Sequence, residues 1–409
     1  MTRAAKEKYH GTSATSEVRE FRIRMGMELD LMNLWFGKTA DYFKQFISDP
    51  TIGMARINRF DFTTLPINLL YLLYYEYRKN AKESLNFSFF EYGKNSNGNP
   101  DDDRWEMYLE LQEMYAILQR WYNDKELYHY LGFLFFNFKA QTPFRDIYTQ
   151  WKALNSRDKF LKDIQHTIAT RMLDRYLEET EKAAPDYQKC LKTMTEAISD
   201  FRENWYNNDK ELYQILILLD IFRILDSKSI KKLPTDYFTR KSGQKDGEDK
   251  EHILSQTPRK DNGEIATIKT DWERFAQSED FKDIRSQMQE ILNHSDAELT
   301  EQELTQLQNL LNSAGLNSIG NMVLLDLRIN RSYGNADYAH KRTIIFQEYM
   351  NQKYVRPHTL AVFMKGDIDA REATGIPLNR WTLEDIKRNT DKIAKEIGKN
   401  FNAWLTQNN

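Results

Sequence analysis

The chain has 409 residues, 40% hydrophobic and 13% aromatic, which is enough for two or three domains with buried cores. Disordered chains are poorer in aromatic residues, so this composition excludes that class. The formal net charge of -3 at pH 7 excludes a chain-wide basic field for nucleic acid, so any such site must be local. The single cysteine, Cys190, excludes a disulfide framework and cysteine-based zinc sites.

The N-terminal segment and the apolar runs indicate where the protein works. Residues 1–20 are polar, so we expect a flexible leader and no signal peptide. The longest apolar runs, 69–75 and 127–138, are shorter than the roughly 20 residues that cross a bilayer. With the lone cysteine, these features predict a cytoplasmic protein that does not enter the membrane.

Residues 21–230 show the apolar spacing of helices. Apolar residues recur at helical intervals in 31–46, 107–118 and 161–172. The segment 93–103 (GKNSNGNPDDD) has the composition of a loop, and its aspartates suit the start of the next helix. We therefore predict a large helical domain, rich in Tyr and Phe, over 21–230.

A short sequence occurs twice within this predicted domain. Residues 121–128 are WYNDKELY, and residues 205–213 are WYNNDKELY. In each copy an aspartate, Asp124 or Asp209, can cap the helix that follows. We interpret the pair as two similar helix starts, and a duplication as the less favoured alternative.

The character of the sequence changes near residue 230. The charged, glycine-containing segment 231–250 predicts a domain boundary. Two short strand-like pieces follow, 251–255 and 318–325. Between them we predict an acidic helical insert, 264–316. Acidic residues outnumber basic ones by 11 to 4 in its first part, 264–305, so it should repel phosphate.

The last part of the chain has the opposite balance of charge. From residue 319 to the C-terminus, 14 Lys and Arg stand against 10 Asp and Glu, which gives a modest local basic surface. Closing helices that contain Trp381 and Trp404 are expected to pack back on the domain 231–409. The predicted fold is mostly α, with a small α+β domain after the helical one.

Glu251, His252 and Asn330 have the chemistry of a metal-dependent hydrolase of phosphodiesters. Adjacent side chains on a strand point to opposite faces, but at a strand end both can approach one ion. A carboxylate and an amide oxygen suit Mg²⁺, and a neutral imidazole can take a proton from water. A lone Glu-His pair is nevertheless more often a surface accident. Likewise Asn321 can be a turn residue, and Lys341 with Arg342 can be a solvated helix face.

These residues resemble the C-terminal part of the GmrSD-type modification-dependent restriction endonucleases, whose cutting domain is a variant of the HNH, or ββα-metal, nuclease. The family pattern is an acidic residue with His and Ile, then Ile-Gly-Asn, an Asn, and an Asn-to-Lys stretch. This sequence supplies Glu251-His252-Ile253, Ile319-Gly320-Asn321, Asn330, and Asn335 to Lys341. The nuclease domain of the RNA-guided CRISPR enzyme is similar too. Its middle Asn and its metal-ligand Asn are nine residues apart, as are Asn321 and Asn330.

The resemblance implies a role for each matching residue. His252 would be the general base, and Asn321 would orient the His loop through backbone hydrogen bonds. Glu251 and Asn330 would bind Mg²⁺, with Mn²⁺ as a possible substitute. The implied DNA contacts are Arg331, Asn335, Lys341 and Arg342.

Two departures from the family pattern limit what carries over. Ser255 stands where the family usually has Pro, and the nucleotide-dependent domain with its Asp-Gly-Gln-Gln-Arg-type motif is not found. The sequence predicts a Mg²⁺-dependent DNA endonuclease of a bacterial anti-phage restriction system, with a separately encoded nucleotide-binding subunit as an expected partner. The alternatives are a catalytically weak, nuclease-like interaction subunit and a nuclease that acts on RNA.

Overall fold

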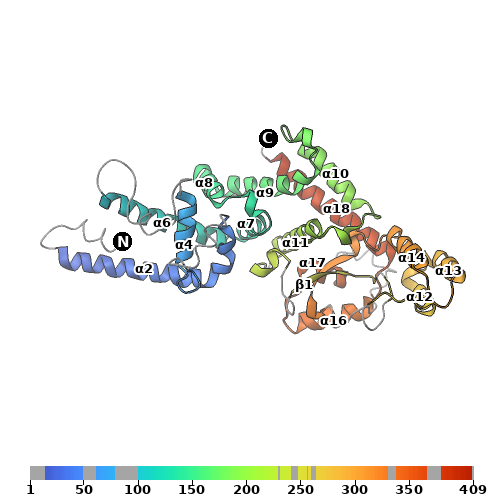
Figure 1. The fold of residues 1–409 in the computed structure, drawn as a ribbon. Helices are drawn as coiled ribbons and strands as arrows, with labels where there is room; N and C mark the ends of the chain where they lie inside the picture. Colours follow the sequence, from blue (N-terminus) through green and yellow to red (C-terminus); the bar gives the residue numbers. More distant parts are fainter. Residues whose placement is uncertain are drawn as a thin grey trace. The chain divides into compact units, whose positions relative to one another are not determined.

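The computed structural model is mostly helical, with one two-stranded sheet in the part of the chain it describes (Figure 1). That part comprises residues 14–48, 61–78, 100–228, 231–240, 247–255, 257–258, 264–329, 338–365 and 379–407. The chain divides into two compact units, Met1–Gln165 and His166–Asn409. Among the described helices, none combines the length and the apolar character that a membrane span requires.

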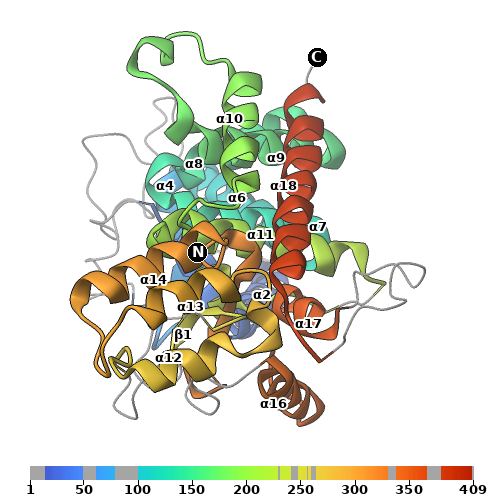
Figure 2. The same cartoon turned by 90° about the vertical axis from the view of Figure 1, so that its right-hand side faces the viewer.

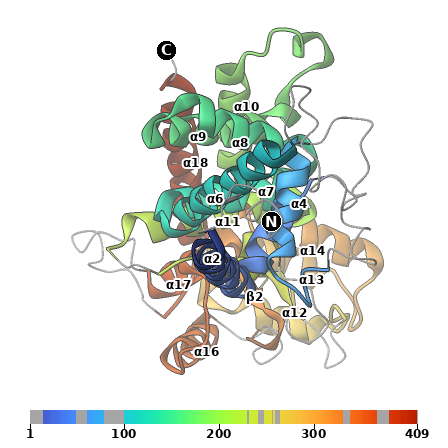
Figure 3. The same ribbon diagram turned by 90° about the vertical axis from the view of Figure 1, so that its left-hand side faces the viewer.

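The first unit is a set of helices (Figure 3). They are α2 (Ala14–Phe43), α4 (Asn68–Arg78), α6 (Pro100–Asn123), α7 (Lys125–Phe138), α8 (Phe144–Leu154) and the start of α9 (Arg157–Leu173). They confirm the helices expected over 31–46, 107–118 and 161–172. However, α2 begins within the predicted leader 1–20. Of the predicted loop 93–103, residues 100–103 belong to α6 and the rest lie outside the described residues.

Aromatic side chains fill the core of this first unit, as the composition predicted. Phe46 stacks on Phe135 with ring centroids 3.9 Å apart, and Trp121 stacks on Phe160 at 5.5 Å. All four rings are fully buried. Large apolar rings of this kind contribute both buried area and specific ring-edge geometry, so they account for the close packing of these short helices.

The two copies of the repeated sequence begin helices in different ways. Asp124 caps α7 as predicted, since its Oδ1 accepts hydrogen bonds from the backbone N–H groups of Glu126 and Leu127, both at 3.0 Å. The expected cap at Asp209 is wrong. Asn208 precedes α11 (Asp209–Asp226) without a side-chain cap, and the carboxylate of Asp209 binds Lys250 instead.

Four helices form the frame of the second unit: α10 (Tyr187–Ser199), α11, α17 (Pro357–Met364) and α18 (Leu383–Thr406). Helix α10 lies along α18 (Figure 2), and α11 packs against α17. The predicted helical domain 21–230 includes α10 and α11 together with the N-terminal helices. In the structure they share a compact unit with the strands, because α11 is apolar on nearly every side and needs partners all round.

The sheet pairs β1 (Glu248–His252) with β2 (Met322–Asp326) in antiparallel register, with Glu248 opposite Asp326 and His252 opposite Met322. Both strands lie close to the pieces predicted at 251–255 and 318–325, but β1 begins three residues earlier. It ends at His252 because the next backbone N–H groups bond to Asn321 rather than to a strand. Residues 319–321 form a 3-10 turn, not a strand.

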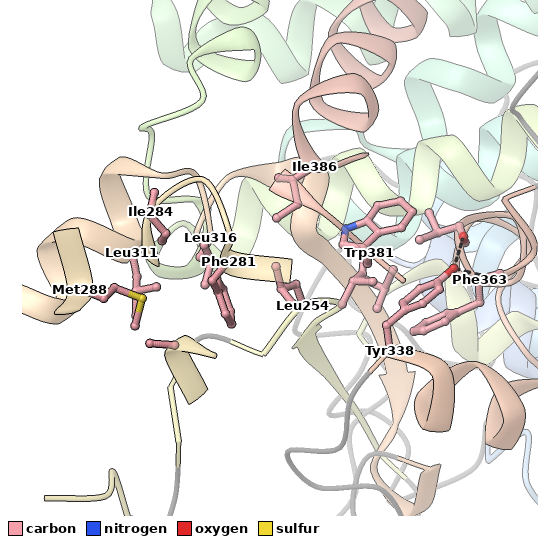
Figure 4. Packing of buried hydrophobic residues seen from close by; sticks show 14 of the residues in the cluster. Leu254, Phe281, Ile284, Met288, Leu311, Leu316, Tyr338, Phe363, Trp381 and Ile386 are labelled. Carbon is pink, nitrogen blue, oxygen red and sulfur yellow. Dashed lines mark hydrogen bonds between the residues drawn. The ribbon is translucent and has the colours of Figure 1, made fainter. Parts of the chain in front are cut away.

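The predicted acidic insert is helical, which confirms that expectation. Its helices are α12 (Lys269–Ala276), α13 (Arg285–Asn293) and α14 (Glu301–Ser313), seen together in Figure 2. A shared hydrophobic core joins the insert to the residues that follow β1. In the view of Figure 4, Leu254 lies between Phe281 of the insert and the pair Tyr338–Trp381. Trp381 stacks on Tyr338 with centroids 5.7 Å apart, so this closing segment packs back as expected.

A buried cluster of charges holds the beginning of β1. Arg356 donates from Nε to Glu248 Oε1 at 2.8 Å and from Nη1 to Asp220 Oδ2 at 2.8 Å. The same guanidinium donates to the carbonyl of Tyr237, and Asp220 also accepts from the N–H of His358. The carboxylates and the guanidinium are at most 2% exposed. The cluster therefore ties α11, β1 and the start of α17 together.

Replacing Arg356 with Met should destabilise this unit by about 3–5 kcal/mol, because two carboxylates would stay buried without their cation. Chemical denaturation of the full chain measures the change in the free energy of unfolding. The matched control is Arg328→Met, since Arg328 is 63% exposed and its ion pair with Asp326 should contribute no more than about 1 kcal/mol. Equal losses in the two variants would contradict the assignment.

Candidate nuclease site

Asn321 holds the backbone that follows β1. Its side chain is fully buried in the turn Ile319–Asn321. Nδ2 donates to the carbonyls of Leu254 at 3.0 Å and Leu316 at 2.9 Å, and Oδ1 accepts from the N–H of Leu254 at 2.8 Å. The carbonyl of Asn321 accepts from the N–H of Ile253 at 2.9 Å. Asn321 thus fixes the two residues after His252 and ties them to Leu316, just before the turn.

Gly320 allows helix α18 to approach this turn closely. A Cβ at this position would lie 2.3 Å from the carbonyl oxygen of Ile386 and 2.3 Å from Oγ1 of Thr390. Asn389 on the same helix donates to the Gly320 carbonyl at 2.8 Å. Because no side chain fits here, glycine is required for the close packing that supports Asn321.

His252 is half-buried at the end of β1, and two residues that sequence reasoning missed contact its ring. Tyr206 stacks on the imidazole with centroids 4.7 Å apart and an angle of 19° between the planes. Nε2 lies 2.9 Å from Oδ1 of Asn317. Tyr206 belongs to the repeated sequence at 205–213 and Asn317 stands four residues before Asn321, and neither position carried a signal on its own.

Lys341 on α16 (Tyr338–Met350) points inward to the site. Its Nζ donates to Glu251 Oε1 at 3.0 Å and to the carbonyl of His252 at 2.7 Å. The Lys341 side chain is 0% exposed and that of Glu251 19% exposed. Burial lowers the pKa of Lys341, and the nearby Glu251 carboxylate opposes that shift.

This burial corrects two expectations for Lys341. The alternative of a solvated helix face is wrong for this residue, and the geometry does not support a phosphate contact, because the ammonium group is used internally. Arg342 differs, since it is half-buried, donates from Nε to the carbonyl of Phe363 at 2.9 Å and lies over the ring of Phe346. Its phosphate contact stays a prediction. Asn330, Arg331 and Asn335 lie outside the described residues.

Glu251 is the described carboxylate that fits a divalent cation here. Among the residues that the structure describes, no group of three or more His, Cys, Asp or Glu is arranged to hold a metal. Mg²⁺ does not need such a cage, since it usually takes one or two carboxylates with waters and substrate phosphates. Lys341 contacts Oε1 of Glu251, so Oε2 is the oxygen that a cation would share. The site thus fits a Mg²⁺ ion that would take its remaining ligands from water and from the substrate phosphate.

The fold and this geometry define a helix-rich domain with a Glu-His pair at the end of a two-stranded sheet. Residues 195–396 match the family model described as the C-terminal domain of GmrSD restriction endonucleases. This segment, just under half of the chain, is therefore similar to the C-terminal domain of that family, as the resemblance indicated. The family points to a nuclease with DNA as its substrate. No curated protein and no solved structure matched the chain.

Replacing Lys341 with Met should destabilise the chain by about 1–3 kcal/mol, because a largely buried carboxylate and a carbonyl would lose their donor. Chemical denaturation gives the measurement, and Lys353→Met is the control, since Lys353 is 54% exposed beside Glu348. Adding Glu251→Gln to the Lys341 variant should recover part of the loss. The pairing would be refuted by a double variant that loses the sum of both single losses.

Proposed function

We propose that the chain is a Mg²⁺-dependent endonuclease that hydrolyses DNA in a bacterial anti-phage restriction system. One observation supports the proposal most directly. Glu251 and His252 are consecutive residues at the end of β1, and Asn321 holds the backbone of the next two residues, Leu254 through its side-chain amide and Ile253 through its carbonyl. A metal ligand and a proton acceptor at one strand end are what hydrolysis of a phosphodiester needs.

His252 is the general base in this proposal. Its imidazole takes a proton from the attacking water, the water oxygen bonds to phosphorus, and the bond from phosphorus to the 3′ oxygen breaks. Asn321 keeps the His loop in place, and Glu251 and Asn330 would hold the metal. A bound Mg²⁺ supplies charge stabilisation of the phosphate and of the departing oxygen.

The proposed contacts to the DNA backbone are those that the resemblance implies. Arg331, Asn335 and Arg342 are the proposed phosphate contacts, and Lys341 instead holds Glu251. Because these contacts are few, DNA affinity should be weak, and because they are made to phosphates it should fall as salt is raised. A separately encoded nucleotide-binding subunit would then supply recognition.

Replacing His252 with Ala should slow cleavage of plasmid DNA by about a hundredfold to ten-thousandfold, with DNA binding and thermal stability near those of the parent. Nicking rates with Mg²⁺ measure the effect. His294→Ala is the matched control, because His294 is an exposed residue at the C-terminal end of the insert helix α13. If the His252 variant nicks as fast as the parent, the catalytic assignment fails.

Cleavage should require Mg²⁺ or Mn²⁺ and disappear with EDTA, since imidazole alone does not stabilise the departing oxygen. Glu251→Gln and Asn330→Ala should each shift the metal titration of the nicking rate to higher concentration. The control is Glu301→Gln in the insert helix α14. Unchanged titrations in both site variants would favour the nuclease-like interaction subunit.

The same assay distinguishes the remaining alternatives. Parallel reactions with RNA identify the nucleic acid, since faster cleavage of RNA would replace DNA as the substrate. Reactions on modified and unmodified phage DNA use the chain without nucleotide or added protein. Efficient and selective cutting under those conditions would exclude the need for a partner subunit.

A further inference from the structure

The imidazole of His252 is held at one of its two nitrogens by a buried amide. Asn317, 5% exposed, presents Oδ1 to Nε2 of His252 at 2.9 Å. A carbonyl oxygen only accepts hydrogen bonds, so a neutral ring in this contact carries its proton on Nε2. The lone pair of the neutral ring then lies on Nδ1.

Two further contacts hold Asn317, one at its side-chain amide and one at its backbone. Its Nδ2 donates to Oδ1 of Asn312 at 2.7 Å, which leaves Oδ1 directed at His252. Its backbone carbonyl accepts from the N–H of Trp205 at 2.9 Å. Trp205 precedes Tyr206, whose ring stacks on the imidazole, so one short segment positions both the amide and the ring plane.

We propose that Asn317 is a positioning residue that fixes the tautomer and orientation of His252, so that the lone pair of the neutral ring lies on Nδ1. The consequence for catalysis rests on the proposed function. Asn317 occupies Nε2, so Nδ1 is the nitrogen through which the ring would act on the attacking water.

The location of the ring proton tests this proposal without any measurement of cleavage. Nuclear magnetic resonance on the full chain, with heavy nitrogen in its histidines, identifies the protonated nitrogen at a pH above the ordinary titration of histidine. The spectrum of His252→Ala assigns the signals, because they vanish there. We expect the proton on Nε2, with slow exchange into water. A proton on Nδ1 in the parent would overturn the proposal.

Substitutions at position 317 test the cause. In Asn317→Ala the Nε2 proton should exchange at least about tenfold faster, because its acceptor is gone. Asn317→Asp keeps an acceptor and should keep the slow signal, which matters if the Ala variant does not fold. Asn68→Ala removes a buried amide in the first unit and should leave the signal unchanged. Unchanged exchange in Asn317→Ala, or equal loss in Asn68→Ala, would refute the role.

Cleavage kinetics give the second readout. Asn317→Ala should lower kcat about ten- to hundredfold with little change in KM, and Asn317→Asp should restore most of that loss. A change in KM alone would contradict a positioning role. If even the parent chain cleaves no nucleic acid, the proposed function fails, and the ring proton still decides whether Asn317 holds His252.

Discussion

The framework of the site depends on the buried ion pairs of the Arg356 guanidinium with Glu248 and Asp220. The guanidinium reaches Glu248 across 108 residues of sequence and Asp220 across 136. A buried charge of either sign is tolerated only when it is paired and hydrogen-bonded, so these three side chains must assemble together. Their assembly places the first residue of β1, and the register with β2 then carries that placement to His252 at the other end.

The far end of β1 is held by neutral hydrogen bonds and by one inward-facing cation. Asn321 satisfies backbone groups of two separate segments, and Lys341 bonds to the carboxylate and the carbonyl at the strand end. The two devices differ in chemistry. An amide fixes geometry with little electrostatic effect, whereas a buried ammonium 3.0 Å from Glu251 also changes the charge of the site. A second cation at Glu251 would therefore share a carboxylate that already has one positive neighbour.

The insert contributes packing rather than charge to the site. Its acidic side chains lie mainly on exposed positions, while Phe281, Leu307 and Leu311 join the core that contains Leu254. Asn317 lies four residues after the last insert helix ends at Ser313 and donates to Asn312 of that helix, so the position of the helix also determines where the amide meets His252. The acidic insert, which we expected not to contact DNA, therefore still affects the surroundings of the His252 imidazole.

The sequence by itself determined the features that depend on local pattern. Helical spacing predicted the helices over 31–46, 107–118 and 161–172, the cap at Asp124 followed from a short motif, and Glu251 and His252 were identified as candidates from their residue types. These are properties of neighbouring residues, and they need no knowledge of distant contacts. Only the tertiary structure decided that Lys341 faces inward, that Asp209 pairs with Lys250 instead of capping its helix, and that Tyr206 and Asn317 contact His252. Each of these outcomes joins residues far apart in sequence, and burial of polar groups fixes their partners only after the core has formed.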